Sequence, residues 1–116
     1  MQLVVIVLNR TEYLEDLLKE FAERGISGAT ILDSTGMARV LGSHEDLHIF
    51  GSLRMMFNPE RQESKTVLTV LPEEKIPVLK EIVRDVVGDL SKPDTGILFG
   101  VPLSFVEGMG GAPLGK

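Results

Sequence analysis

The stretch QLVVIVL, residues 2–8, opens a pattern that recurs later in the chain and so decides the predicted fold. It is followed by an amphipathic run, TEYLEDLLKEFAERG at residues 11–25, and by a second apolar run, GATILD at residues 28–33. The same order returns as KTVLTVL, EEKIPVLKEIVRDVVG and TGILFGV within residues 65–101. Short, β-branched apolar runs are typical of strands buried on both faces. The pattern therefore predicts two strand–helix–strand units, either as simple βαβ units or as the split variant with another strand inserted.

Each amphipathic run carries one apolar stripe at helical spacing and ends at a glycine. The stripe of the first run consists of Leu14, Leu17, Leu18, Phe21 and Ala22. The stripe of the second run consists of Leu79, Ile82, Val83 and Val86. Apolar residues three and four apart lie on one side of a helix, so each run is predicted to form a helix that packs on the strands. Gly25 and Gly88 stand just past these helices, where a C-capping glycine is expected.

The starts of the two helices leave alternatives open. Asn9 or Thr11 can cap the first helix, because a side-chain oxygen at that position accepts a hydrogen bond from a free backbone N–H. In the second helix, Pro77 lacks the N–H that would bond back along the chain. Either the first turn tolerates this proline, or the regular helix begins near Ile76.

Two helices can cover only one face of a four-stranded sheet, yet these strands are apolar on both sides. Simple alternation predicts one face formed by Val4, Ile6, Leu68 and Val70. It predicts a second face formed by Val5, Val7, Val67 and the hydroxyl of Thr69. Exposed apolar surfaces of this size invite association, so the uncovered face must be hidden from water. A closed symmetric oligomer with inward-facing sheets would hide it.

The composition predicts one ordinary folded domain. The chain has 116 residues, of which 43% are hydrophobic and 25% charged, and it has no cysteine, which excludes a thiolate nucleophile or metal ligand. The net charge of −5 and the lack of a basic cluster argue against a nucleic-acid-binding protein. Residues 2–8 are too short to cross a membrane, so a cytoplasmic protein without membrane insertion is expected. No Walker-type phosphate loop is present and nothing demands catalysis, so we do not expect an enzyme.

Residues 36–64 form a long interruption between the two units. Long connections without regular structure are uncommon in compact domains and are often functional, so this segment is predicted to carry the function of the protein. The preceding DSTG, residues 33–36, suits either a turn or a ligand loop. Ser43 and Asp46 match a capping box, and the apolar residues after them predict a short helix that ends at Asn58. Its apolar side can cover its own domain or a neighbouring subunit, or it can dock a partner.

One short motif within the interruption has the spacing of a metal site. HEDLH, residues 44–48, matches the pattern that places two imidazoles on one side of a helix for zinc, with Glu45 as a base. A metalloprotease would also need a third ligand and a substrate cleft, and the chain is small for such an enzyme. The two remaining interpretations are metal binding through His44 and His48, or a solvated helix start.

Three segments together resemble the PII signal-transduction family of nitrogen-regulatory proteins. They are GISGATILDSTGMAR at residues 25–39, PEEKIPVLKEIV at residues 72–83 and KPDTGILFGVPL at residues 92–103. The similarity extends from about residue 2 to residue 105. It implies one PII-like domain, residues 1–116, with a long loop at 36–64 and a flexible tail at 106–116.

The resemblance implies both a fold and a function. The implied fold is α+β and ferredoxin-like, βαββαβ, with a four-stranded antiparallel sheet and two helices on one face. Members of the family form homotrimers with inward-facing sheets and bind ATP or ADP, often with 2-oxoglutarate, between subunits. Their long loops then dock onto transporters, enzymes or transcription factors. A trimeric signalling protein that acts on a partner through residues 36–64 is therefore expected.

The resemblance also implies a set of ligand contacts. They fall on eight positions: Thr30 beside the adenine, Gly36, Met37 and Arg39 at the base of the loop, and Lys92, Asp94, Thr95 and Gly96 in the turn before the last strand. Here Gly96 stands near the place of the family's phosphate-binding lysine, and residues 106–108 replace its arginines. The predicted ligand is an adenine nucleotide or another small anion.

Other departures limit what can be carried over from the family. The loop contains no tyrosine, which excludes uridylylation there. An alternative function is that of a metal-binding trimer, similar to the divalent-cation-tolerance proteins, that uses His44, Glu45 and His48.

Overall fold

The structure is a computed structural model that describes residues 1–42 and 63–108. Its elements, in chain order, are β1 (Gln2–Leu8), η1 (Thr11–Tyr13), α1 (Leu14–Glu23), β2 (Thr30–Ser34), α2 (Met37–Gly42), β3 (Ser64–Leu71), η3 (Glu73–Lys75), α4 (Ile76–Val86) and β4 (Gly96–Pro102). Here η marks a 3₁₀-helix. Among these residues, no helix is both long enough and apolar enough to cross a membrane.

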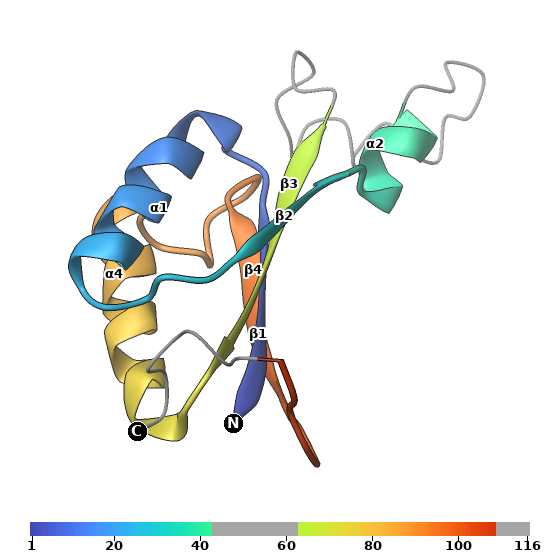
Figure 1. Cartoon of the computed structure of the whole chain (residues 1–116). Coiled ribbons are helices and arrows are strands. Elements are labelled where there is room, and N and C mark those ends of the chain that lie inside the picture. Colours follow the sequence, from blue (N-terminus) through green and yellow to red (C-terminus); the bar gives the residue numbers. More distant parts are fainter. Residues whose placement is uncertain (43–62, 109–116) are drawn as a thin grey trace.

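The four strands form one antiparallel sheet in the order β2-β3-β1-β4. Helices α1 and α4 lie together on one face of it, and the short helix α2 stands on the other side (Figure 1). The predicted α+β class, with two helices on one face of a four-stranded antiparallel sheet, is confirmed and is compatible with a ferredoxin-like βαββαβ fold. Since β3 lies between β1 and β2, the split form of the βαβ unit is the correct alternative.

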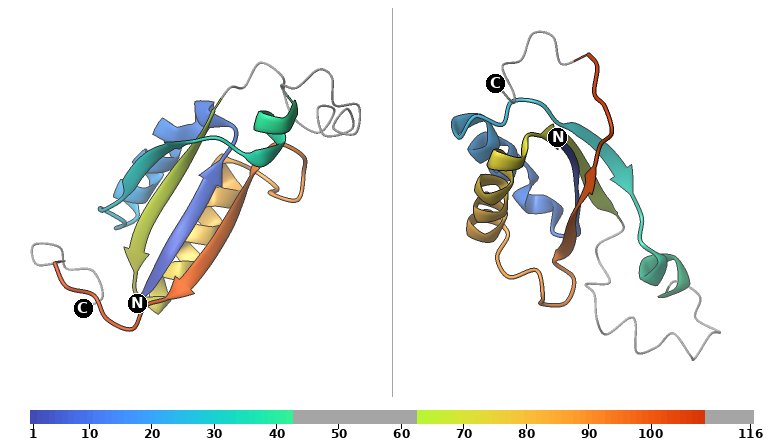
Figure 2. Two further views of the ribbon diagram at one scale, coloured as in Figure 1. Left: turned by 90° about the vertical axis from the view of Figure 1, so that its right-hand side faces the viewer. Right: turned by 90° about the horizontal axis from the view of Figure 1, so that it is seen from below.

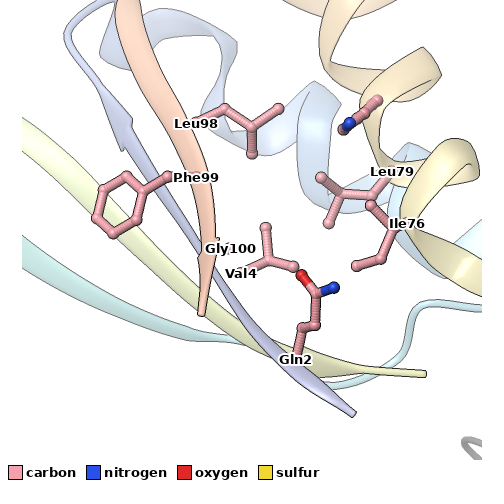
Figure 3. A pocket seen from close by; sticks show the side chains of 8 residues that line it. Gln2, Val4, Ile76, Leu79, Leu98, Phe99 and Gly100 are labelled. Carbon is pink, nitrogen blue, oxygen red and sulfur yellow. The ribbon is translucent and has the colours of Figure 1, made fainter. Parts of the chain in front are cut away.

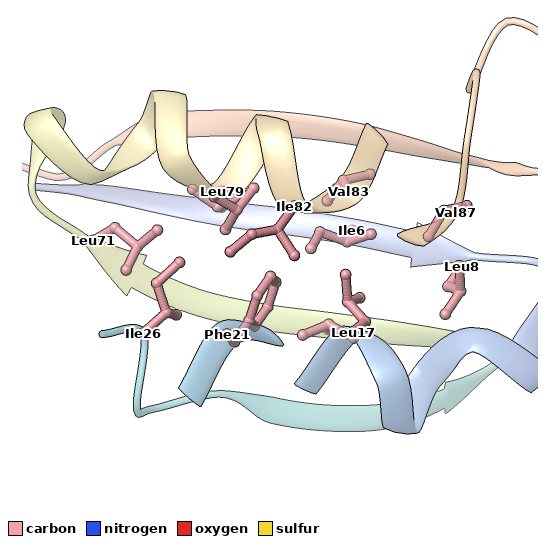
Figure 4. Close-up of a cluster of buried hydrophobic side chains, with 12 residues drawn as sticks. Ile6, Leu8, Leu17, Phe21, Ile26, Leu71, Leu79, Ile82, Val83 and Val87 are labelled. Carbon is pink, nitrogen blue, oxygen red and sulfur yellow. The ribbon is translucent and has the colours of Figure 1, made fainter. Parts of the chain in front are cut away.

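The hydrophobic core lies between this sheet and the two long helices (Figure 4). Leu17 and Phe21 reach it from α1, and α4 contributes the fully buried Leu79, Ile82 and Val83. All five belong to the predicted apolar stripes. Burial of side chains this large, at about 25 cal/mol per Å² of apolar surface, is the main force holding the helices to the sheet.

The strand register corrects the predicted composition of the two faces. Ile6 lies opposite Val67, and Val4 lies opposite Thr69, so these four side chains share the helix-covered face. Leu68 and Val70, assigned above to the same face as Val4 and Ile6, lie on the other face instead. The prediction failed because alternation along each strand is readable in the sequence, whereas the register between two strands is decided by their pairing.

Both long helices end at the predicted glycines. Gly25 has φ +86°, its N–H bonds to the Ala22 carbonyl, and the N–H of Ile26 bonds to the Phe21 carbonyl at 2.7 Å. These two bonds form a Schellman motif, which satisfies carbonyls that the end of α1 leaves open. Gly88 has φ +101°, and its N–H bonds to the Arg84 carbonyl. This bond ends α4 with the αL capping motif.

The 3₁₀ turns before the two long helices, η1 and η3, were not predicted from the sequence. Each long helix follows directly on its 3₁₀ turn. Arg10 is the N-cap residue of η1 and Tyr13 that of α1, and neither makes a side-chain capping bond. Helix α4 begins at Ile76, with Pro77 in its first turn, where a backbone N–H would have no partner within the helix. The alternative that placed the regular helix near Ile76 is therefore correct.

Helix α2, only six residues long, was not predicted from the sequence. Asp33 and Ser34 end strand β2, and Thr35 and Gly36 link it to α2, whose first turn is closed by a bond from the Val40 N–H to the Gly36 carbonyl. The predicted helix that starts at Ser43 lies outside the described residues, as does most of the predicted tail, residues 106–116.

Candidate functional site

The candidate site is the end of the sheet where α2 meets the turn that precedes β4. These two segments approach each other beside the ends of the strands (Figure 2). The Arg39 guanidinium donates a hydrogen bond of 3.0 Å from Nη2 to Oδ1 of Asp94. Their side chains are only 8% and 12% exposed. Two of the predicted ligand-binding residues, 55 positions apart in the sequence, thus form one part-buried ion pair.

The turn at residues 89–95 is built from its own polar groups. Oδ1 of Asp89 accepts hydrogen bonds from the backbone N–H and the hydroxyl of Ser91, at 2.9 and 2.7 Å, and these bonds lower the pKa of the Asp89 carboxyl below its usual value. The buried hydroxyl of Thr95 lies 2.7 Å from the Lys92 carbonyl and 3.1 Å from the Leu90 carbonyl. The predicted contact residue Thr95 therefore holds the shape of the turn, while the Lys92 side chain is exposed.

Asp94 has an unusual backbone conformation within this turn. Its φ is +57°, the left-handed region, and it is the only residue other than glycine with a positive φ in residues 1–42 and 63–108. Aspartate tolerates this region better than most residues but still loses some free energy there. The carboxylate of this residue is the one that contacts Arg39.

Gly96 occupies a position where the backbone itself requires glycine. Its φ is +152°, and a Cβ at this position would collide with the carbonyl oxygen of Val7. The absence of a side chain lets β4 approach β1 closely as the strand begins. This requirement explains Gly96 without any contact to a ligand.

Thr30 does not lie with the other predicted contact residues in a single chain. It is at the start of β2, opposite Leu68, in the cross-strand row that continues to Val5 and Phe99. Strand β2 is one edge of the sheet and β4 is the other. Gly36 and Met37, by contrast, lie at the start of α2, and the Met37 side chain is 74% exposed. One chain therefore brings α2 to the turn at residues 89–95 and leaves Thr30 apart from both.

The sheet face opposite the long helices is apolar, and we call it the open face. Its side chains are Leu3, Val5 and Val7 of β1, Leu32 of β2, Leu68 and Val70 of β3, and Ile97, Phe99 and Val101 of β4. Ile97 and Phe99 are 55% and 44% exposed. Large contiguous apolar surfaces are uncommon on monomeric proteins and mark interaction sites.

A cluster of hydroxyl groups occupies the end of the open face near α2. The hydroxyl oxygen of Ser34 lies 2.7 Å from that of Ser64 and 2.8 Å from that of Thr66. On the helix-covered side of the same strands, Lys65 forms an ion pair with Asp33, and this hydrogen bond raises the pKa of Lys65. The buried hydroxyl of Thr69 is satisfied by the Gly28 carbonyl.

A separate groove lies between α4 and the edge strand β4 (Figure 3). Its volume is about 290 Å³, and its apolar lining is formed by Val4, Ile76, Leu79 and Leu98. Gly100 faces the helices from β4 and contributes no side chain, which leaves this space open. None of the eight predicted contact residues lines it.

The predicted metal site remains a prediction. His44, Glu45 and His48 lie outside the described residues. Within residues 1–42 and 63–108, no group of three or more histidine, aspartate or glutamate side chains is arranged to hold a metal ion.

Comparison of the sequence with protein-family models and with curated proteins gave no match. Both segments were predicted from the sequence as parts of a ligand site, but their interaction was not, because α2 was not predicted. The only sequence signal for their pairing was the opposite charge of Arg39 and Asp94.

Proposed function

We propose that this chain is a PII-like regulatory protein and not an enzyme. In this proposal it forms a homotrimer, binds a small anionic ligand between subunits, and acts on a protein partner through residues 36–64. The observation that carries the proposal is the contact between α2 and the turn at residues 89–95, made by Arg39 and Asp94. A pre-organised cation beside a polar turn, at the base of a long insertion, suits a sensor that couples ligand binding to a protein contact.

The open face supports the oligomeric part of the proposal. Apolar side chains from all four strands gather on this face, and burying them between copies would stabilise the assembly by about 25 cal/mol per Å² of apolar surface. A closed ring of inward-facing sheets hides the face on every copy, whereas an open chain of copies would leave exposed ends. Such a ring also brings the β2 edge of one copy, with Thr30, near other copies. Light scattering coupled to gel filtration is expected to report a trimer, and a stable monomer at micromolar concentration would contradict this part.

The charges around the site limit the class of ligand. Arg39 and Lys92 are its cations within the described residues, and Asp89 and Asp94 oppose them. A carboxylate, a bicarbonate or one phosphoryl group can be neutralised there, whereas a triphosphate finds little positive charge. ATP is therefore expected to bind weakly unless a divalent cation bridges it to the aspartates.

A thermal-shift screen with nucleotides, cyclic dinucleotides, bicarbonate, 2-oxoglutarate and divalent metals tests the proposal. A specific ligand at one hundred times its dissociation constant should stabilise the folded protein by about 2.7 kcal/mol. Hydrogen exchange in residues 36–64 should slow when that ligand is present, since the proposal couples the ligand to this segment. If a ligand binds and hydrogen exchange in residues 36–64 does not change, the proposed coupling between the ligand and this segment is contradicted.

Replacing Arg39 with alanine is expected to weaken the binding of an anionic ligand by about 1.5–3 kcal/mol, because a charge-assisted hydrogen bond is lost. Titration calorimetry with the ligand found in the screen measures the difference. Lys19→Ala is the matched control, because Lys19 is an exposed cation on α1. Tight ATP binding without magnesium that survives Arg39→Ala would show that the site lies elsewhere.

A further inference from the structure

The groove between α4 and β4 combines an apolar floor with two polar side chains. The floor consists of four apolar side chains, two from α4 and one each from β1 and β4. Gln2 of β1 and Lys80 of α4 are the polar residues of the lining. At about 290 Å³ the groove is at the lower end of the size range of ligand pockets, so it suits one small molecule with an apolar body.

The side-chain amide of Gln2 presents its oxygen to this groove. Its Nε2 donates a hydrogen bond of 2.8 Å to Oε2 of Glu73. An ionised carboxylate only accepts hydrogen bonds, so the amide nitrogen must face Glu73 and the amide oxygen must face the other way. Figure 3 shows this oxygen turned toward Val4 and Gly100. Within residues 1–42 and 63–108, Oε1 of Gln2 accepts no hydrogen bond, so it can accept one from a ligand.

Gly100 leaves the space into which the Gln2 amide oxygen points. A Cβ at this position would collide with Oε1 of Gln2, and the φ of Gly100 is not in the region that favours glycine. Space, and not backbone conformation, therefore explains the glycine. Glycine weakens the interior of a strand and often marks a place where a ligand comes close to the backbone. The lack of a side chain at position 100 thus keeps the groove open.

Lys80 adds a positive charge to the lining. It is exposed on α4, and within the described residues it forms no ion pair or hydrogen bond. Its ammonium donors suit a carboxylate. The amide oxygen of Gln2, whose nitrogen is bonded to the Glu73 carboxylate, suits a positively charged donor such as an ammonium group. A ligand that satisfies both residues carries an ammonium group, a carboxylate and an apolar body.

We propose that this groove binds a free amino acid with an apolar side chain. The ammonium group of the amino acid donates to Oε1 of Gln2, its carboxylate accepts from Lys80, and its side chain lies on the apolar floor. The inference goes beyond the proposed function, because none of the eight predicted contact residues lines the groove. The groove also lies on the helix-covered side of the sheet, which a trimer with inward-facing sheets turns outward.

Three compounds of similar shape test whether both charged groups are recognised, with titration calorimetry on the full chain as the readout. L-Leucine is the probe, isocaproate lacks its ammonium group, and isoamylamine lacks its carboxylate. L-Leucine should bind at least about tenfold more tightly than either, because a hydrogen bond to a charged group contributes about that factor or more. If isocaproate or isoamylamine binds as tightly as L-leucine, the groove does not recognise both charges and the proposal is wrong. If L-leucine, L-methionine and L-phenylalanine all fail to bind at millimolar concentration, the proposal is overturned.

Substitution of each polar residue should affect one group of the ligand. Lys80→Gln should weaken L-leucine binding about tenfold and leave isoamylamine binding unchanged, since isoamylamine has no carboxylate. Gln2→Met should weaken L-leucine binding about tenfold and leave isocaproate binding unchanged, since isocaproate has no ammonium group. Lys19→Gln is the control, because it removes an exposed cation from α1. An equal loss for all three compounds in either variant would show that the residue does not contact the assigned charge, which contradicts the proposal.

Gly100→Val tests the space in the groove. Valine suits an extended strand, and its side chain would occupy the place next to the Gln2 amide, so L-leucine binding should be lost. Ile97→Val is the control, because it changes the same strand on the open face. Circular dichroism checks that both variants fold, and if Gly100→Val does not, the result for Lys80→Gln decides. L-Leucine binding that survives Gly100→Val would place the amino acid elsewhere and overturn the inference.

The same measurements separate this inference from the proposed function. Arg39→Ala removes the cation of the proposed anion site and should leave L-leucine binding unchanged. If Arg39→Ala abolishes L-leucine binding, the amino acid binds at the anion site and the inference about the groove is wrong. If L-leucine does not bind but an anionic ligand does, the inference fails and the proposed function stands.

Discussion

Replacing Val5 with glutamate is expected to convert the proposed trimer into monomers. Val5 lies on the central strand β1, and its cross-strand neighbours on the open face are Leu68 and Phe99. In a ring with inward-facing sheets, the substitution places an unpaired carboxylate in an apolar contact on every copy. A penalty of about 3 kcal/mol per contact weakens association by more than a hundredfold. Light scattering coupled to gel filtration measures the change in mass.

The fold of the monomer should survive this change, since the open face of a separate copy is in contact with water. Far-ultraviolet circular dichroism of Val5→Glu should therefore match that of wild type. Ala22→Glu is the control, because it adds the same charge at an exposed position of α1. An unchanged mass for Val5→Glu would show that the open face is not the contact between copies.

Replacing Gly96 with alanine is expected to lower the free energy of unfolding by about 3 kcal/mol or more. The alanine Cβ would meet the carbonyl oxygen of Val7, a backbone atom that cannot rotate away, and the φ of +152° is unfavourable for any side chain. Relief requires β4 to move from β1, which breaks the pairing on which the core depends. The melting temperature measured by thermal unfolding should fall by roughly 10 °C or more.

Gly28→Ala is the matched control for this experiment. A Cβ at Gly28 would meet no atom within 4 Å, and its φ is not in the region that favours glycine. The substitution should change the free energy of unfolding by less than about 0.5 kcal/mol. Equal losses in the two variants would mean that the approach of β4 to β1 is not what requires a glycine at position 96.

Local patterns in the sequence determined the elements that are regular over many residues. The stripes of α1 and α4 were predicted because a 3.6-residue period leaves an unambiguous apolar side. The ends at Gly25 and Gly88 were predicted because a left-handed C-cap requires glycine. That one sheet face would remain uncovered followed from counting four apolar strands against two helices.

Three features were decided only by the tertiary structure. The register of β1 against β3 reassigned Leu68 and Val70 to the open face, because strand pairing depends on contacts between residues 57 to 69 positions apart. The six-residue helix α2 is too short to form alone, so its sequence carries little signal. Arg39 and Asp94 were known only as opposite charges on separate segments, and the fold alone brings them to 3.0 Å with little of either side chain exposed. The sequence determined which residues are available to the site, and chain folding determined which of them meet, because burial and distance are properties of the whole packed structure.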